Sequence, residues 1–386
     1  MLFRSVPAGV VVDATYGRGG HAEAIVRTHP HLRVVAVDRD PEAVRAAEEL
    51  RRREPALAAR LSVHHARFDQ VADVLAALGV RTISGALFDL GVSSPQLDDA
   101  SRGFSYRQDG PLDMRMDPGS ALSAADVVND YDEARLAEVI RAHSDERFAR
   151  RIARAIVARR PLRTTLELAE IVTAAIPAPA RRTGGHPAKR TFQALRIEVN
   201  GELDALEGAL GWALEATVPG GRVAVLSYHS GEDRIVARVF RGAERRPGGV
   251  VASPYVHEDR AGGGSARRLR VPKHPSQAER TAHPRSRSAR LRAVERCVPA
   301  AAIAMSCAKA IVSLLVVPMI TRMAAMGAQA EGRGTDGVSL ARRRGQGGRS
   351  CRWQQRAQPV ERLQRLARRE IVRRQSAQLG FDRRRR

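Results

Sequence analysis

The first 296 residues of this chain contain no cysteine. The chain has 386 residues and three cysteines, which are Cys297, Cys307 and Cys351. Disulfide bonds and cysteine metal sites are therefore excluded from the main body, which suits a reducing compartment. We also expect no secretory signal peptide, because no charged leader precedes the first apolar run and that run passes directly into Asp13. We predict a cytoplasmic protein that holds no metal ion.

Aromatic and acidic residues are both scarce. Aromatic residues make up 4% of the chain, and 42 Asp and Glu stand against 65 Lys and Arg, which gives a net charge of +23. Such a surplus favours a polyanionic partner. More than half of it lies beyond residue 297, so the first 296 residues are only modestly basic. The length allows two or three domains with cores of their own.

Residues 298–386 differ in character from the rest. They open with the apolar run "VPAAAIAMSCAKAIVSLLVVPMI" and continue as Arg- and Gly-rich sequence without a folding pattern. The run is long enough to cross a bilayer, but Lys309 in its middle and Pro318 near its end are unfavourable there. A membrane anchor, a disordered nucleic-acid tail and translation of GC-rich DNA in an unintended frame all fit. We favour the last and expect no membrane partner.

Apolar strands alternate with helices at both ends of the first 296 residues. Predicted strands are Val10–Val12, Leu32–Asp38, a run that ends near Asp89, and Arg222–Ser227. A helix follows the second strand, with Pro41 in its first turn. This alternation predicts an α/β fold with a mostly parallel sheet that helices cover on both faces.

Residues 104–199 show no strand pattern. Apolar residues recur there at helical spacing in three sets, namely Leu136, Val139 and Ile140, then Phe148, Ile152 and Ile156, then Leu168, Ile171 and Val172. We therefore predict four parts: a first part of the core (1–103), a helical insertion (104–199), a second part of the core with a basic tail (200–296), and the extension 298–386.

The basic tail, from about Gly242 to Arg296, is rich in Gly, Pro, Ser and Arg. Its cations could contact RNA phosphates, or they could simply be solvated, and the sequence does not decide between these. A non-enzymatic RNA-binding or membrane-associated protein that depends on the basic C-terminal region is a further alternative.

A glycine cluster follows the first strand, in "VVDATYGRGGHAEAIV" (Val11–Val26). Glycine allows close approach of a ligand and positive φ, and the start of the next helix favours negative charge. Asp38 ends the next strand, where a carboxylate can accept hydrogen bonds from both ribose hydroxyls. These features predict an adenosine site. They also fit an NAD-dependent oxidoreductase, since Gly17, Gly19 and Ala22 match G-x-G-x-x-A, or a turn that binds no ligand.

A second polar stretch, "FDLGVSSPQLDDASRGFSYRQDGPLDMRMDP" (Phe88–Pro118), begins where a central strand should end. Ligands of open α/β sheets bind at this carboxyl edge. The two stretches, together with "HPAKRTFQALRIEVNGEL" and "GGRVAVLSYHSGEDRIV", resemble the ribosomal RNA small subunit methyltransferase H family over about Val10 to Arg296. Four separated motifs in the family's order are far more specific than one glycine turn.

The resemblance implies a Rossmann-like, S-adenosylmethionine-dependent methyltransferase sheet with an inserted helical substrate-recognition domain. It implies methylation of the exocyclic N4 amine of a cytidine in 16S rRNA, with free rRNA or the small ribosomal subunit as partner. The family pattern places the cofactor against Gly19, Gly20, His21, Asp38, Phe68, Asp89 and Gln96. By residue type alone, Phe68 before a helix is more typical of a core. A homodimer is compatible with the sequence, which does not decide the oligomeric state.

No single residue is identified as catalytic. Hydrogen-bond acceptors beside the reacting amine would favour methyl transfer, and candidates are Ser93, Ser94, Asp113 and the loop backbone after Asp89. His229 could take the departing proton or be a hydrogen-bonded structural histidine.

In the motif that begins at His186, the candidate RNA contacts are Lys189, Arg190 and Arg196. The alternative there is an amphipathic helix whose apolar stripe joins the core. Gly231 stands where the family pattern has Leu, and residues 298–386 have no family counterpart.

Overall fold

The computed structural model describes residues 2–181, 185–244 and 265–297. The predictions for the extension 298–386 lie outside these residues, as do Cys307 and Cys351. Among the described residues, no helix is long and apolar enough to span a bilayer.

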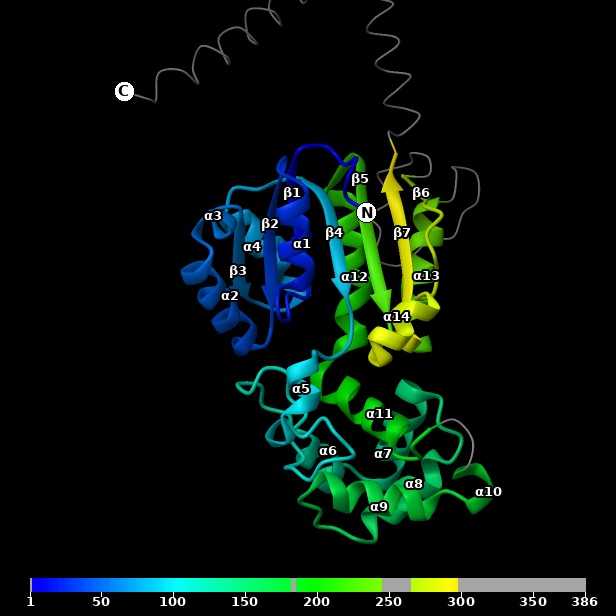
Figure 1. Ribbon diagram of the computed structural model, residues 1–386. Coiled ribbons are helices and arrows are strands. Elements are labelled where there is room, and N and C mark those ends of the chain that lie inside the picture. Colours follow the sequence, from blue (N-terminus) through cyan, green and yellow to red (C-terminus); the bar gives the residue numbers. More distant parts are fainter. Residues whose placement is uncertain (1, 182–184, 245–264, 298–386) are drawn as a thin grey trace, which may run out of the picture. The chain divides into compact units, whose positions relative to one another are not determined.

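Within the described residues, seven strands form one sheet in the order β3-β2-β1-β4-β5-β7-β6 (Figure 1). They are β1 (Gly9–Asp13), β2 (Leu32–Asp38), β3 (Leu61–His65), β4 (Ile83–Asp89), β5 (Thr217–Ser227), β6 (Ala266–Arg268) and β7 (Arg290–Arg296). β1 to β5 are parallel, and Val12 of β1 lies between Val35 of β2 and Ala86 of β4. The carboxyl ends of five strands therefore meet at one edge, and the predicted α/β fold is confirmed.

Helices cover both faces of the sheet because apolar side chains alternate along the strands. In β2, Val34 and Ala36 pack on one face, while Val35 and Val37 pack on the other. The first face is covered by α1 (Gly20–Thr28), α2 (Pro41–Arg53) and α3 (Pro55–Ala58). The second is covered by α4 (Val71–Ala77), α12 (Glu202–Ala216) and α13 (Ser230–Glu244), with the short helix η1 (Phe68–Gln70) before α4.

The start of α2 is set by its own sequence. Asp40 is the N-cap, and its Oδ1 accepts a hydrogen bond from the Glu42 N–H at 3.0 Å. Pro41 at the first helical position and acidic Glu42 in the first turn both favour a helix N-terminus. The helix therefore begins directly behind the carboxyl end of β2, which places Asp38 and Asp40 at the same edge.

A second apolar core lies within the helical part that follows β4. After α5 (Ser94–Asp98) and η2 (Ala100–Arg102) come α6 (Ala124–Asp130), α7 (Glu133–Ser144), α8 (Ala149–Val157), α9 (Thr165–Ala175), α10 (Ala178–Arg181) and α11 (Lys189–Asn200). Leu136, Ile152, Leu168 and Leu195 are all fully buried in it. The predicted helices are present. That residues 104–199 form a separate domain stays a prediction.

The prediction of a basic tail is wrong for its last seven residues. β7 lies inside the sheet, between β5 and β6, with Ala293 and Val294 buried. Two of its three arginines are paired, since Arg290 and Arg292 both donate to the Asp233 carboxylate of α13. Two short helices, α14 (Gln277–Ala282) and η3 (Pro284–Ser288), join β6 to β7. The alternation in "RLRAVER" was the strand signal, and the arginine content concealed it.

Candidate functional site at the carboxyl edge of the sheet

The glycine turn links β1 to α1 at the carboxyl edge. Gly17 and Gly19 have φ of 54° and 82°, and Gly19 is the N-cap of α1. A Cβ at Gly19 would lie 2.5 Å from the Tyr16 hydroxyl oxygen, so no larger residue fits there without a shift of that ring. Burial raises the pKa of Tyr16 to about 12, so its hydroxyl stays neutral. The Gly17 N–H donates to Asp38 and the Gly19 N–H donates to the Tyr16 carbonyl. The donors open to a ligand are therefore those in the first turn of α1, which have no intrahelical partner.

Asp38, at the end of β2, faces this turn. Its Oδ2 accepts a hydrogen bond from the Gly17 N–H at 2.7 Å, and its Oδ1 accepts one from the Asp40 N–H at 2.8 Å. Burial raises the pKa of this carboxyl, while the two N–H donors oppose the rise. An open hollow lies beside it, lined by Gly17, Arg18, Asp38, Asp40, Glu42, Ala43, Ser93, Pro95 and Gln96.

Asp40 connects this hollow to two other segments. Its Oδ2 accepts hydrogen bonds from Gln96 Nε2 at 2.8 Å and from Arg102 Nη1 at 3.0 Å. The Arg102 guanidinium also donates to the carbonyls of Arg115 and Met116. The Arg102 and Asp40 side chains are only 11% and 7% exposed, so their ion pair is shielded from solvent. The hollow, α5 and the loop around Met116 are therefore fixed to one carboxylate.

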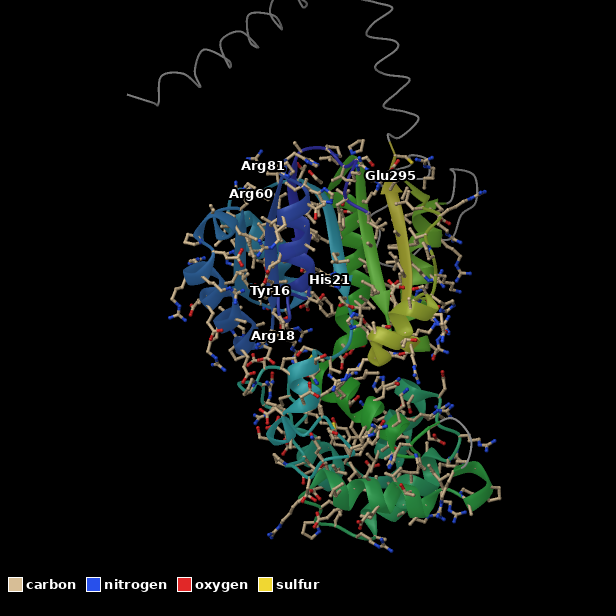
Figure 2. All side chains as sticks on the ribbon, in the orientation of Figure 1. Tyr16, Arg18, His21, Arg60, Arg81 and Glu295 are labelled. Carbon is tan, nitrogen blue, oxygen red and sulfur yellow. The ribbon has the colours of Figure 1, made fainter. Side chains whose placement is uncertain are left out.

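His21, in the first turn of α1, lies against the ends of β4 and β5. Its Nε2 is 3.1 Å from Asp89 Oδ2, and the Tyr228 hydroxyl donates to Asp89 Oδ1 at 2.9 Å. The hydrogen bond to Asp89 raises the pKa of His21, and burial opposes this. Figure 2 shows His21 at the same edge as Tyr16 and Arg18, opposite the edge that carries Arg81. The structure thus brings together residues predicted from two separate motifs.

Asp13 lies beneath this cluster and is fully buried. Its Oδ1 accepts a hydrogen bond from the Thr15 N–H at 3.2 Å, whereas its Oδ2 has no partner among the described residues. Burial raises the pKa of Asp13 to about 7, although the nearby His21 lowers it. An orphaned buried carboxylate oxygen at a ligand-binding edge suits a positively charged ligand group.

The remaining cofactor candidate, Phe68, takes a core position. It lies in η1, partly buried, with its ring edge-on to Phe88 at a centroid distance of 6.3 Å. It is not among the residues that line the hollow beside Asp38. Gly20, by contrast, is the first residue of α1 and has open space beside it, since a Cβ there would meet nothing within 4 Å.

Three of the catalytic candidates follow β4, two at the start of α5 and one in the loop after η2. Ser94 is exposed at the start of α5, and the N–H of Ser93 is bound by Gln96 Oε1 at 3.0 Å. Asp113 is held by Arg115, whose Nε and Nη2 donate to its two oxygens at 3.0 and 2.8 Å. Although burial opposes it, Arg115 keeps the pKa of Asp113 below its usual value. Asp113 can therefore accept hydrogen bonds but is a poor proton acceptor.

The fourth catalytic candidate, His229, is enclosed behind the end of β5. Its side chain is 9% exposed, and its Nε2 lies 3.1 Å from Glu232 Oε1, in a direction that does not make a hydrogen bond. Its Nδ1 faces the Glu232 N–H at 3.4 Å. A Cβ at Gly231 would lie 3.1 Å from that Nδ1, so the family's Leu would require the ring to shift. This placement favours a structural role for His229.

Comparison with known proteins decides the family. A profile of the MraW methylase family matches residues 1–297. The chain belongs to the MraW methylase family. A protein of Acidothermus cellulolyticus is 51% identical over 297 residues, which cover 75% of this chain and 88% of that relative. One from Mycobacterium leprae is 52% identical over 297 residues, or 74% and 77% of the two chains. Both relatives are named ribosomal RNA small subunit methyltransferase H.

The topology of this MraW methylase does not fit the oxidoreductase alternative. A dinucleotide fold joins two mononucleotide-binding halves in an all-parallel sheet of order 3-2-1-4-5-6. Here the first half is present as β3-β2-β1, but the far side of the sheet ends in the antiparallel strands β7 and β6. The enzyme is a methyltransferase, and the NAD-dependent hypothesis has no support.

The three cations predicted to contact RNA are placed differently along α11. Lys189 and Arg190, in its first turn, are exposed, and Arg190 is 3.6 Å from buried Glu146. Arg196 is 14% exposed and forms two hydrogen bonds with Glu202, at 2.8 and 3.0 Å. The structure therefore brings Lys189 and Arg190 to the surface and uses Arg196 to join α11 to α12.

Sequence reasoning missed four residues of this edge: Asp13, Asp40, Arg102 and Tyr228. Three of them had a weak signal, because Asp13 ends a parallel strand, Tyr228 follows one, and Asp40 precedes a helix that begins with proline. Arg102 had none, since a buried ion pair across 62 residues leaves no local pattern. No group of three or more potential metal ligands is found among the described residues.

Proposed function

We propose that this methylase transfers a methyl group from S-adenosylmethionine to the exocyclic N4 amine of a cytidine in 16S rRNA of the small ribosomal subunit, in the cytoplasm. The observation that carries the proposal is the similarity to relatives of that name, at 51–52% identity over most of both chains. The four motifs of the family pattern support the choice of nucleoside and position. A homodimer and the absence of a metal stay predictions.

The residues at the carboxyl edge fit this cofactor. The hollow beside Asp38 offers a carboxylate to the ribose hydroxyls, which are hydrogen-bond donors. The N–H groups in the first turn of α1, which have no intrahelical partner, suit a carboxylate, and the orphaned Asp13 oxygen beside His21 and Asp89 suits an ammonium group. Together these match the adenosine and methionine ends of one molecule. When bound, S-adenosylmethionine supplies an electrophilic methyl group on a sulfonium.

The chain's main contribution to the reaction is alignment. A cytosine amine is a weak nucleophile because its lone pair is delocalised into the ring, so positioning and acceptors for its N–H groups favour attack. The ionised Asp113 and the loop after Asp89 are the acceptors we assign to this task. His229 is too enclosed to receive the proton, which we expect to pass to solvent after transfer. The base must leave its stack to reach the edge.

Labelled methyl transfer tests the proposal. The protein is incubated with methyl-labelled S-adenosylmethionine and small ribosomal subunits that lack the modification, and the rRNA is digested to nucleosides. We expect label in N4-methylcytidine only. Label in another nucleoside would overturn the assigned position. If neither free 16S rRNA nor the rRNA of assembled subunits carried label, the assigned substrate would be wrong.

A further inference from the structure

An exposed pair of stacked rings lies beside the start of α11. The rings of Tyr106 and His186 are parallel within 18°, with centroids 4.6 Å apart. Tyr106 is itself set edge-on against buried Phe192, at 5.8 Å and 81°. Tyr106 is partly buried, whereas His186 is exposed. The inner ring is therefore fixed by the core, and the outer ring is presented to solvent.

Three cations lie next to this pair in the chain. The Arg107 guanidinium is 5.8 Å from the Tyr106 ring centroid. Lys189 and Arg190 follow His186 in the first turn of α11, where the Lys189 N–H also donates to the His186 carbonyl. Arg107, Lys189 and Arg190 are all exposed. Only 4% of the chain is aromatic, so a preformed stack at the surface, rimmed by positive charge, is unusual within this molecule.

We infer that the His186–Tyr106 pair is a stacking platform for an unpaired nucleobase of the RNA substrate. Proteins that read single-stranded RNA stack splayed bases on Tyr, Phe, Trp or His, while nearby cations bind the phosphates. Both elements are present here on adjacent residues. The platform lies on the helical part and not at the carboxyl edge, so it takes a base that flanks the reacting cytidine. The inference rests on the proposed function, which supplies the RNA.

The stack has a further consequence for binding. Ordering a flexible ring in a complex costs conformational entropy. Here Phe192 and Tyr106 already hold the His186 ring in a stacked orientation, so less is lost when a base is added. A purely electrostatic surface would need no such arrangement.

The test compares His186→Ala, His186→Phe and the control His31→Ala in the full-length protein. His31 is exposed and sits before β2, at the opposite edge of the sheet. Affinity for unmodified small ribosomal subunits is measured at one fixed salt concentration. We expect His186→Ala to bind about fivefold or more weakly, and His186→Phe and His31→Ala to bind as the wild type does. Affinity for S-adenosylmethionine should not change in any of them. His186→Ala and His186→Phe should lower the melting temperature by a similar amount, because both lose the hydrogen bond that His186 Nδ1 accepts from the Ala188 N–H.

Three outcomes would overturn the inference of a stacking platform. The first is wild-type binding by His186→Ala. The second is equal weakening by His186→Phe, which would assign the effect to charge or hydrogen bonding. The third is weaker binding of His186→Ala to assembled subunits but not to protein-free 16S rRNA, which would indicate a ribosomal protein as the partner. None of these affects the proposed function, which fails only if the wild type transfers no methyl group to the subunit. As a direct readout, His186→Trp should show fluorescence quenching on RNA binding.

Discussion

The carboxyl edge of the sheet and the start of α11 use charge in opposite ways. At the edge, Asp40 and Arg102 are 7% and 11% exposed and are fixed by each other and by neighbouring backbone groups. At the start of α11, Arg190 is 57% exposed and has one loose ion pair. A small charged cofactor is held by preorganised, shielded groups, whereas a long polyanion needs only accessible cations. Substitutions should therefore cost much at the edge and little on the helix.

The largest expected effect comes from Arg102→Leu. It leaves the Asp40 carboxylate buried without its cation, and breaking such a pair typically costs about 3–5 kcal/mol of unfolding free energy. Urea unfolding measures the change. The control is Arg45→Leu, because Arg45 is 65% exposed beside Glu42 on the same helix, and it should change stability by less than about 0.5 kcal/mol. Equal effects of the two substitutions would show that the Asp40–Arg102 pair is not structural.

Arg102→Lys sharpens the same comparison. A lysine can keep the charge beside Asp40 but cannot also donate to the carbonyls of Arg115 and Met116. We expect a folded enzyme with near-normal cofactor affinity and a reduced kcat, because the loop that carries Asp113 is no longer fixed to the cofactor hollow. An unchanged kcat would contradict a positioning role for Arg102.

Asp38→Ala should have the next largest effect, on cofactor binding. It removes a carboxylate that can accept hydrogen bonds from two hydroxyls, each worth about 1.5–3 kcal/mol when the acceptor is charged, so we expect at least about 100-fold weaker binding of S-adenosylmethionine by calorimetry. Asp38→Asn retains an acceptor oxygen for the Gly17 N–H and serves as the matched variant for local folding. Unchanged affinity in both would contradict the assignment of the hollow.

Asp13 gives the edge a measurable pH dependence. Its pKa is raised by burial from 3.8 to about 7, so between these values the folded state holds a proton that the unfolded chain lacks. The contribution of Asp13 to the unfolding free energy therefore falls as pH rises, by about 1.4 kcal/mol per unit, and this loss is complete above pH 7. In Asp13→Asn the difference in unfolding free energy between pH 5 and pH 7.5 should be smaller than in the wild type by about 2 kcal/mol. Asp73→Asn, at an exposed site on α4, should keep the wild-type difference.

The contrast also explains what could be predicted from the sequence. β1, β2 and β4 end in aspartates that follow apolar runs, so a local pattern indicated both the sheet and its ligand edge. β7 was not predicted because Arg290 and Arg292 form ion pairs with Asp233, which is nearly sixty residues away in the sequence. Arg196 was predicted at an RNA surface, yet Glu202 of the next helix holds it inside. The sequence gives the sign of each charge, but tertiary contacts decide which residue pairs with a charge and whether the pair is buried.

The smallest expected effect is on the helix. Lys189→Gln removes one exposed cation, so RNA binding should weaken only a few-fold, and the slope of log affinity against log salt concentration should fall by about one. Arg81→Gln is the control, since Arg81 is exposed at the opposite edge of the sheet (Figure 2), and its slope should match the wild type. Cofactor affinity should be unaffected in both. If Lys189→Gln instead lowered cofactor affinity as strongly as Asp38→Ala does, the separation between shielded edge and accessible helix would be wrong.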